Sequence, residues 1–85
     1  MNIMKADYYL SWDVTQFKNE YGDEIEMEII QYPNEYLVTV NICDEQPPYR
    51  DFTATGTHPR NKKHAAKKAM ILLYKQAYPE LFNRK

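Results

Sequence analysis

The sequence predicts an α+β domain, an α-β-β-β-α sandwich in which two helices pack on one face of a three-stranded antiparallel sheet. Residues 24–55 contain three short runs with the two-residue alternation of half-buried strands, and stretches with helical spacing precede and follow them. The chain has 85 residues, 44% of them apolar, which suits one domain with one core. We expect that core at about residues 7–78, with a C-terminal extension at 79–85.

The expected first helix covers residues 7–22. Its apolar residues recur at i, i+4, i+7 and i+11: Leu10, Val14, Phe17 and Tyr21. Asp7 is a suitable N-cap and Gly22 a suitable stop. Trp12 falls away from this stripe, so it either wraps onto the edge of the core or serves as an exposed contact residue.

Three strands are expected next, at residues 24–30, 36–42 and 50–55. The first alternates strictly, with apolar side chains on one face and three glutamates on the other: Glu24, Glu26 and Glu28. Pro33 and Asn34 form the turn after it. Gly56 is expected to end the third strand by permitting a backbone turn into the second helix.

The second helix is expected within residues 57–78, beginning between 58 and 61 and capped by Thr57 or Asn61. Its inward stripe has small residues first and large ones later: Ala65, Ala69, Leu72, Leu73 and Ala77. Small side chains at the start allow this helix to approach the sheet closely, so we expect contacts with Val38, Phe52 and Ala54.

The formal net charge of −1 hides a division along the chain. Residues 1–56 hold three Lys or Arg against eleven acids, a net of −8, and residues 57–85 hold eight against one, a net of +7. Five basic residues crowd the start of the second helix: Arg60, Lys62, Lys63, Lys67 and Lys68. Cations there oppose the helix dipole by about 0.3–1 kcal/mol each, so a polyanionic partner explains them better than helix stability does. The alternative is a solvated lysine face.

Other classes of function have little support in the sequence. No nucleophile–base set is visible, and glutamates on the outer face of a strand are typical of a solvated surface rather than of acid–base catalysis. Cys43 is alone and only His58 and His64 accompany it, so we expect no disulfide, no metal and no cofactor. Because no run approaches about 20 apolar residues and no signal-peptide pattern opens the chain, we expect an intracellular protein without a membrane partner.

The start of the second helix resembles the signature of the double-stranded RNA-binding domain family. That signature is roughly a glycine, four variable residues, a small polar residue, Lys-Lys, a variable residue, Ala-Lys, two variable residues and Ala-Ala. The positions that match at the right spacing are Gly56, Lys62, Lys63, Ala65 and Ala69. The resemblance covers residues 7–77, agrees with the element order above, and is closest to helicase-associated members of the family.

The resemblance implies three contact regions on A-form RNA. The lysine pair would bind phosphates across the major groove, the first helix would lie in one minor groove, and the loop between the first two strands would enter the next. In this sequence Ala66 takes the place of the family's third lysine, with Lys67 beside it, and the loop is short and lacks the usual histidine. The implied RNA-binding residues are Trp12, Gln16, Pro33, Asn34, Arg60, Asn61, Lys62, Lys63 and Lys67.

A second hypothesis is a protein-interaction or dimerisation module with weak or no RNA binding. Eight tyrosines and one tryptophan favour it, since these residue types are enriched at protein interfaces. Its partner would be another protein or a second copy of the domain.

Overall fold

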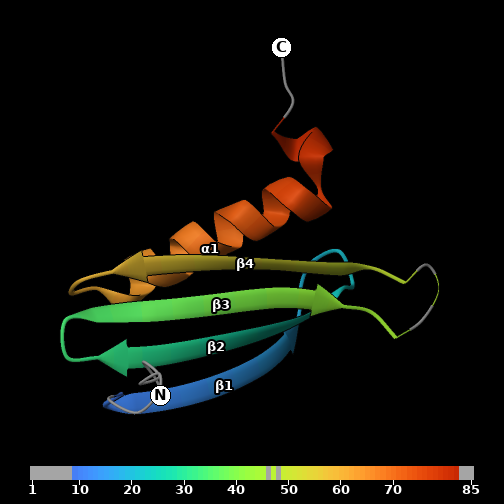
Figure 1. Ribbon diagram of the computed structural model, residues 1–85. Coiled ribbons are helices and arrows are strands. Elements are labelled where there is room, and N and C mark those ends of the chain that lie inside the picture. Colours follow the sequence, from blue (N-terminus) through green and yellow to red (C-terminus); the bar gives the residue numbers. More distant parts are fainter. Residues whose placement is uncertain (1–8, 46, 48, 83–85) are drawn as a thin grey trace, which may run out of the picture.

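The computed structural model describes residues 9–45, 47 and 49–82, which form a four-stranded antiparallel sheet with one helix on it (Figure 1). The elements are β1 (Ser11–Lys18), β2 (Glu24–Tyr32), β3 (Glu35–Cys43), β4 (Asp51–His58), α1 (Lys62–Ala77) and the short 3₁₀ helix η2 (Pro79–Leu81). The strands lie in chain order, so the sheet is a simple meander. Within the described residues, no helix is both long and apolar enough to cross a membrane.

The predicted first helix is wrong, and the predicted α-β-β-β-α order with it. Residues 11–18 form an edge strand that pairs with all of β2 up to Gln31, and the proposed cap Asp7 lies outside the described residues. The strand ends at Lys18, before the predicted stop, and Gly22 lies in the hairpin turn that follows, with a φ of 85°. Asn19 holds this turn, since its Oδ1 accepts the N–H groups of Tyr21 and Asp23 at 2.9 and 3.0 Å.

β1 gave no strand signal because all eight of its residues are exposed. A strand with one covered face alternates apolar and polar residues, whereas β1 carries both kinds on each face. Trp12, Val14, Thr15 and Phe17 are nevertheless residue types that favour a pleated sheet. The residues at 11–18 do have a helical spacing, but the described chain offers no core on which such a helix could pack. Pairing with β2 therefore determines their structure. Trp12, 55% exposed, does not wrap onto a core edge.

The three other predicted strands are confirmed, with each extending by one to three residues at its C-terminal end. The predicted inward face is also correct, since Ile25, Val38, Val40 and Ile42 are buried. Residues opposite one another in the register share a face, so β1 presents Asp13 and Phe17 on this same face, across from Ile29 and Ile25.

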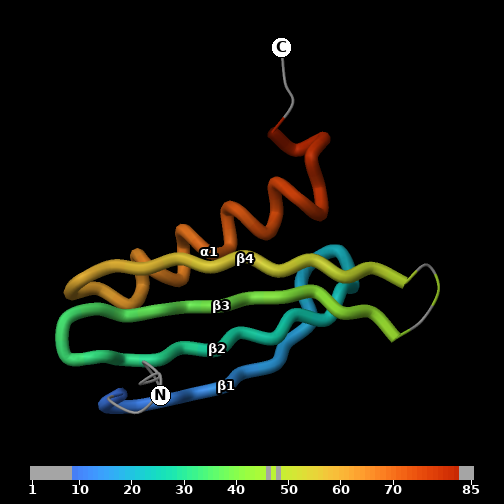
Figure 2. Tube along the Cα trace, viewed as in Figure 1, coloured from blue at the N-terminus to red at the C-terminus, as the bar shows by residue number. Residues whose placement is uncertain are grey.

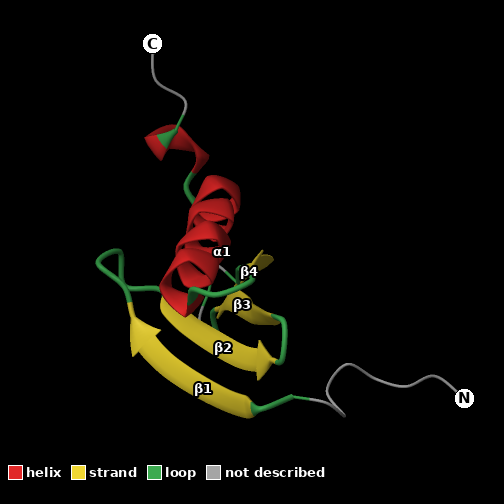
Figure 3. Cartoon of the chain, turned by 90° about the vertical axis from the view of Figure 1, so that its left-hand side faces the viewer, coloured by secondary structure: helices red, strands yellow, loops and turns green. Residues whose placement is uncertain are grey.

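α1 packs mainly on β3 and β4, and β1 is the strand farthest from it (Figure 3). Its buried residues follow a four-residue spacing: Ala65, Ala69, Leu73 and Ala77. Leu72 was wrongly placed in this stripe and is 46% exposed. It belongs to the side of the helix that passes over the outer edge of β4, where Lys68 Nζ and Gln76 Nε2 donate to the carbonyls of Thr57 and Thr53.

Gly56 lies inside β4 and does not end it, contrary to the prediction. A Cβ atom at this position would stand 2.4 Å from the carbonyl oxygen of Ala65 and 2.8 Å from the backbone nitrogen of Ala69. The role of Gly56 is therefore to let the backbone of α1 approach the strand. The predicted close approach of Ala65 and Ala69 to the sheet is confirmed, and both are fully buried.

A polar cluster fastens the C-terminal end of α1 to two loops, and we call it the clamp: Asn19, Asp23, Arg50 and Tyr78. The Tyr78 hydroxyl donates to the Asp23 carboxylate and accepts from Asn19 Nδ2 at 2.8 Å. Arg50 donates to Asp23 at 2.9 Å and to the Ala77 carbonyl at 2.7 Å. The guanidinium thus pairs with a buried carboxylate and also satisfies a carbonyl at the helix end.

Candidate nucleic-acid interface

A tight turn leads from β4 into α1 and presents the basic residues of the chain. His58 is the last residue of β4, and its Nδ1 accepts the backbone N–H groups of Arg60 and Asn61 at 3.1 and 3.0 Å. An imidazole that accepts through Nδ1 carries its proton on Nε2, so the geometry requires neutral His58 in that tautomer. One side chain therefore fixes the direction in which the chain enters the helix.

Asn61 is the N-cap of α1, which decides between the two predicted caps. Its backbone is extended, with φ −130° and ψ 107°, and its Oδ1 accepts the N–H of His64 at 3.1 Å. The first helical residue is Lys62, one position beyond the predicted range of starts. Within the described residues, the backbone N–H groups of Lys62 and Lys63 have no hydrogen-bond partner. Two donors at the positive end of the helix dipole are thus open to an anion.

Four cationic side chains surround these two N–H groups, and we call the whole the basic helix start: Arg60, Lys62, Lys63 and Lys67. All four are exposed, and none forms a hydrogen bond or ion pair with the part of the chain that the structure describes. Lys68 differs, because its ammonium already donates to the Thr57 carbonyl at 3.0 Å. The first turn of α1 has no acidic residue, so its positive field is not neutralised locally.

The turn between β2 and β3 lies at the same end of the molecule as the basic helix start (Figure 2). The strand register explains this, because Tyr36 at the start of β3 lies opposite His58 at the end of β4. Pro33 and Asn34, both exposed, form the tip of that turn. The structure therefore brings together the predicted residues of the second helix and those of the loop.

Trp12 and Gln16 are not part of this assembly. They lie on β1, opposite Ile30 and Glu26, on the sheet face that α1 does not cover. The indole nitrogen of Trp12 donates to Glu28 at 2.6 Å. The predicted minor-groove contact by a first helix is therefore wrong, because that segment is a strand whose even-numbered side chains stand among glutamates.

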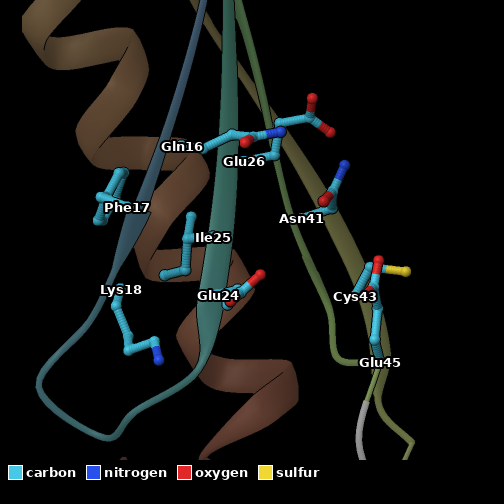
Figure 4. A pocket seen from close by; sticks show the side chains of 9 residues that line it. All are labelled: Gln16, Phe17, Lys18, Glu24, Ile25, Glu26, Asn41, Cys43 and Glu45. Carbon is cyan, nitrogen blue, oxygen red and sulfur yellow. The ribbon is translucent and has the colours of Figure 1, made fainter.

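The sheet face that α1 does not cover contains a hollow of about 550 Å³ whose lining is rich in glutamate (Figure 4). Its charged lining consists of three glutamates and one lysine, Glu24, Glu26, Glu45 and Lys18, while Phe17 and Ile25 point away from the glutamates toward the other face. No three His, Cys, Asp or Glu side chains of the described residues are grouped so as to hold a metal ion. A polyanion would be repelled here, which leaves the basic helix start as the favourable surface.

The pKa of His58 lies below its usual value of 6.5. Desolvation in the turn is the largest cause, followed by the nearby His64 ring, with a centroid separation of 5.1 Å, and the charge of Lys68. The neutral form that the two accepted hydrogen bonds require is thus the favoured one. Sequence reasoning missed this histidine, since only its position after a strand and before a proline marks it.

The fold and the interface together define a small α+β domain with a cationic helix start beside a β-turn. Comparison with protein-family models, with curated proteins and with solved structures finds no match.

Proposed function

We propose that the chain is a non-catalytic module that binds double-stranded RNA through the basic helix start. The observation that carries the proposal is the convergence at one point of four exposed cations and two free backbone N–H groups. Such a point binds phosphate oxygens by charge and by directed hydrogen bonds.

The preference for duplex RNA over other polyanions rests on two features. The major groove of A-form RNA is narrow and lined on both sides by phosphates, so a compact cluster of lysines can bridge it. The turn containing Pro33 and Asn34 stands beside the cluster, where it can reach the adjacent shallow minor groove and its 2′-hydroxyls. The spacing of Gly56, Lys62, Lys63, Ala65 and Ala69 that resembles the double-stranded RNA-binding domain signature favours the same partner.

The interface is smaller than the resemblance alone implies. The segment containing Gln16 lies among acids on the other face, so only two contact regions remain. We therefore expect modest affinity, little sequence preference and a footprint shorter than the ~16 bp of a three-region interface. Duplex RNA as the partner also places the protein inside the cell.

The decisive experiment measures binding to duplex RNA across a salt series. Each phosphate neutralised releases counterions, so the wild type should show a log–log slope of roughly −2 to −4. Changing Lys62→Ala together with Lys63→Ala should flatten that slope by about two and weaken binding equally for all sequences. Both side chains are exposed and unpaired among the described residues, so the fold should be unaffected.

A matched control removes the same charge from the opposite end of the molecule. The double change Lys18→Ala and Lys75→Ala should leave the slope nearly as it is, as should Gln16→Ala. If the Lys62 and Lys63 variant binds as well as the wild type, the basic helix start is only a solvated face and the proposal is wrong.

A second comparison tests the role of duplex shape. Duplex RNA, duplex DNA and single strands of equal length should bind in decreasing order from duplex RNA. Equal affinity for the two duplexes would reduce the interface to an unspecific electrostatic patch.

A further inference from the structure

Among the described residues, α1 leaves the β1 side of its sheet face only partly covered, and we call this part the open half-face. It consists of the exposed side chains of Asp13, Thr15 and Phe17 on β1 and the half-buried Met27 and Ile29 on β2, which pack against the edge of the core. α1 lies on β4 and β3, so all eight residues of β1 remain exposed, with Phe17 at 39%. Figure 3 shows β1 as the strand farthest from the helix.

One side of α1 borders the open half-face. Tyr74 lies on this side, since its ring contacts Tyr21 of the β1–β2 loop and its hydroxyl accepts from Asn19. Helical spacing puts Met70, Lys67 and Lys63 on the same side. The border is therefore apolar near the clamp and cationic near the start of the helix.

We propose that a second copy of this chain covers the open half-face, with the β1–β2 halves of the two sheets stacked face to face about a two-fold axis. Stacked sheets lie about 10 Å apart, which is also about the diameter of an α-helix. The second sheet therefore fits in the layer that α1 occupies, beside the helix. Because the contact is isologous, it closes as a dimer and exposes no further copy of the same surface.

Charge complementarity favours a second copy over an unrelated partner. Asp13 is exposed and unpaired within the described residues, as are Lys63 and Lys67. β1 and α1 begin at the same end of the sheet, as Figure 1 shows. A two-fold axis parallel to the strands leaves the strand direction unchanged, so Asp13 of the second copy lies at the same end of the assembly as Lys63 and Lys67 of the first copy.

The dimer does not depend on RNA binding. The same axis places both basic helix starts at one end of the assembly. Arg60 and Lys62 of each copy stay outside the interface, whereas Lys63 and Lys67 are shared by the dimer contact and the RNA interface, so dimerisation is measured without RNA. Dimerisation without RNA binding, or RNA binding by a monomer, would separate the two proposals experimentally.

Sedimentation equilibrium from micromolar to millimolar concentration tests the proposal. The wild type should show a reversible monomer–dimer equilibrium. Asp13→Lys should weaken association about tenfold or more, as should the double change Lys63→Asp and Lys67→Asp, because each sets like charges against one another. The triple variant should regain most of the affinity, since it restores opposite charges with exchanged positions.

A pair of substitutions on the same strand identifies the face that is used. Phe17→Ser should weaken the dimer, whereas Val14→Ser, on the acidic face, should not. Circular dichroism establishes that each variant is folded. A wild type that stays monomeric at every concentration, equal effects of the two serine variants, or no recovery in the triple variant would each overturn the proposal.

Discussion

Replacing Gly56 by alanine tests how closely α1 approaches the sheet. The added Cβ would lie 2.4 Å from a carbonyl oxygen and 2.8 Å from a backbone nitrogen of α1, and neither atom can swing aside. Relief requires the helix to move by about 1 Å, and a gap of that size forfeits roughly a quarter to a half of each dispersion contact beneath it. Overpacking of a core typically costs about 1–3 kcal/mol, and the lower entropy of the unfolded chain returns about 0.4–1 kcal/mol.

We therefore expect Gly56→Ala to lose about 2 kcal/mol, which lowers the Tm of a domain of this size by roughly 8–16 °C. Thermal and urea unfolding followed by circular dichroism measure both quantities. Gly22→Ala is the matched control, because a Cβ there meets nothing within 4 Å and only its φ of 85° is strained, at about 1–2 kcal/mol. A Gly56 variant as stable as the wild type would mean that α1 does not lie against β4 as described.

Three further predictions concern pH and the polar groups. Burial alone would raise the pKa of Asp23, but hydrogen bonds with Tyr78 and Asp44 and the charge of Arg50 hold it below 3.8. The contribution of ionised Asp23 to the free energy of unfolding is therefore complete above pH 3.8 and is lost as the pH falls further. Asp23→Asn should lower the free energy of unfolding by about 1.5–3 kcal/mol at neutral pH and should remove this dependence on acid. Burial and the Asp23 hydrogen bond raise the pKa of Tyr78 to about 12, so stability should fall between pH 10 and 12 in the wild type. The fall should be smaller in Tyr78→Phe, where only the raised pKa of Tyr74 still contributes. Because the pKa of His58 is lowered from 6.5, stability should fall as the pH drops from that value, and ¹⁵N shifts should show an unprotonated Nδ1 at pH 8.

The sequence predicted β2, β3, β4 and α1, each of which buries one face in the core. It did not predict β1, which buries neither face. Ile25, Val38 and Ala65 belong to patterns of two or four residues because one side of each element meets the core. β1 meets no core in the described chain, so its residues were free of that constraint and happened to match a helical spacing. The number of strands was wrong for this reason.

The candidate interface was predictable where charge density alone defines it. Lys62 and Lys63 stand out in the sequence as cations in an unfavourable position, and the structure places them at the helix start as expected. The roles of His58 and Gln16 depend on strand register, which fixes the side chain to one face or the other. Because the first element was predicted as a helix and is a strand, Gln16 was wrongly assigned to the RNA interface. The assignment of Lys62 and Lys63 to that interface does not depend on the first element.

The clamp reverses the usual pattern of fraying in a helix. Helix ends normally exchange their amide hydrogens first, but Ala77 and Tyr78 are joined to Arg50 and to loop residues more than fifty positions earlier in the chain. The last turn of α1 can open only when the hairpin loop at residues 19–23 opens with it, so its amides should exchange as slowly as those of the central strands. The first turn is held by the caps Asn61 and His58 and by the buried Ala65, without a link to a distant loop of the described chain. The amides of the end that carries the cations should therefore exchange before those of the last turn.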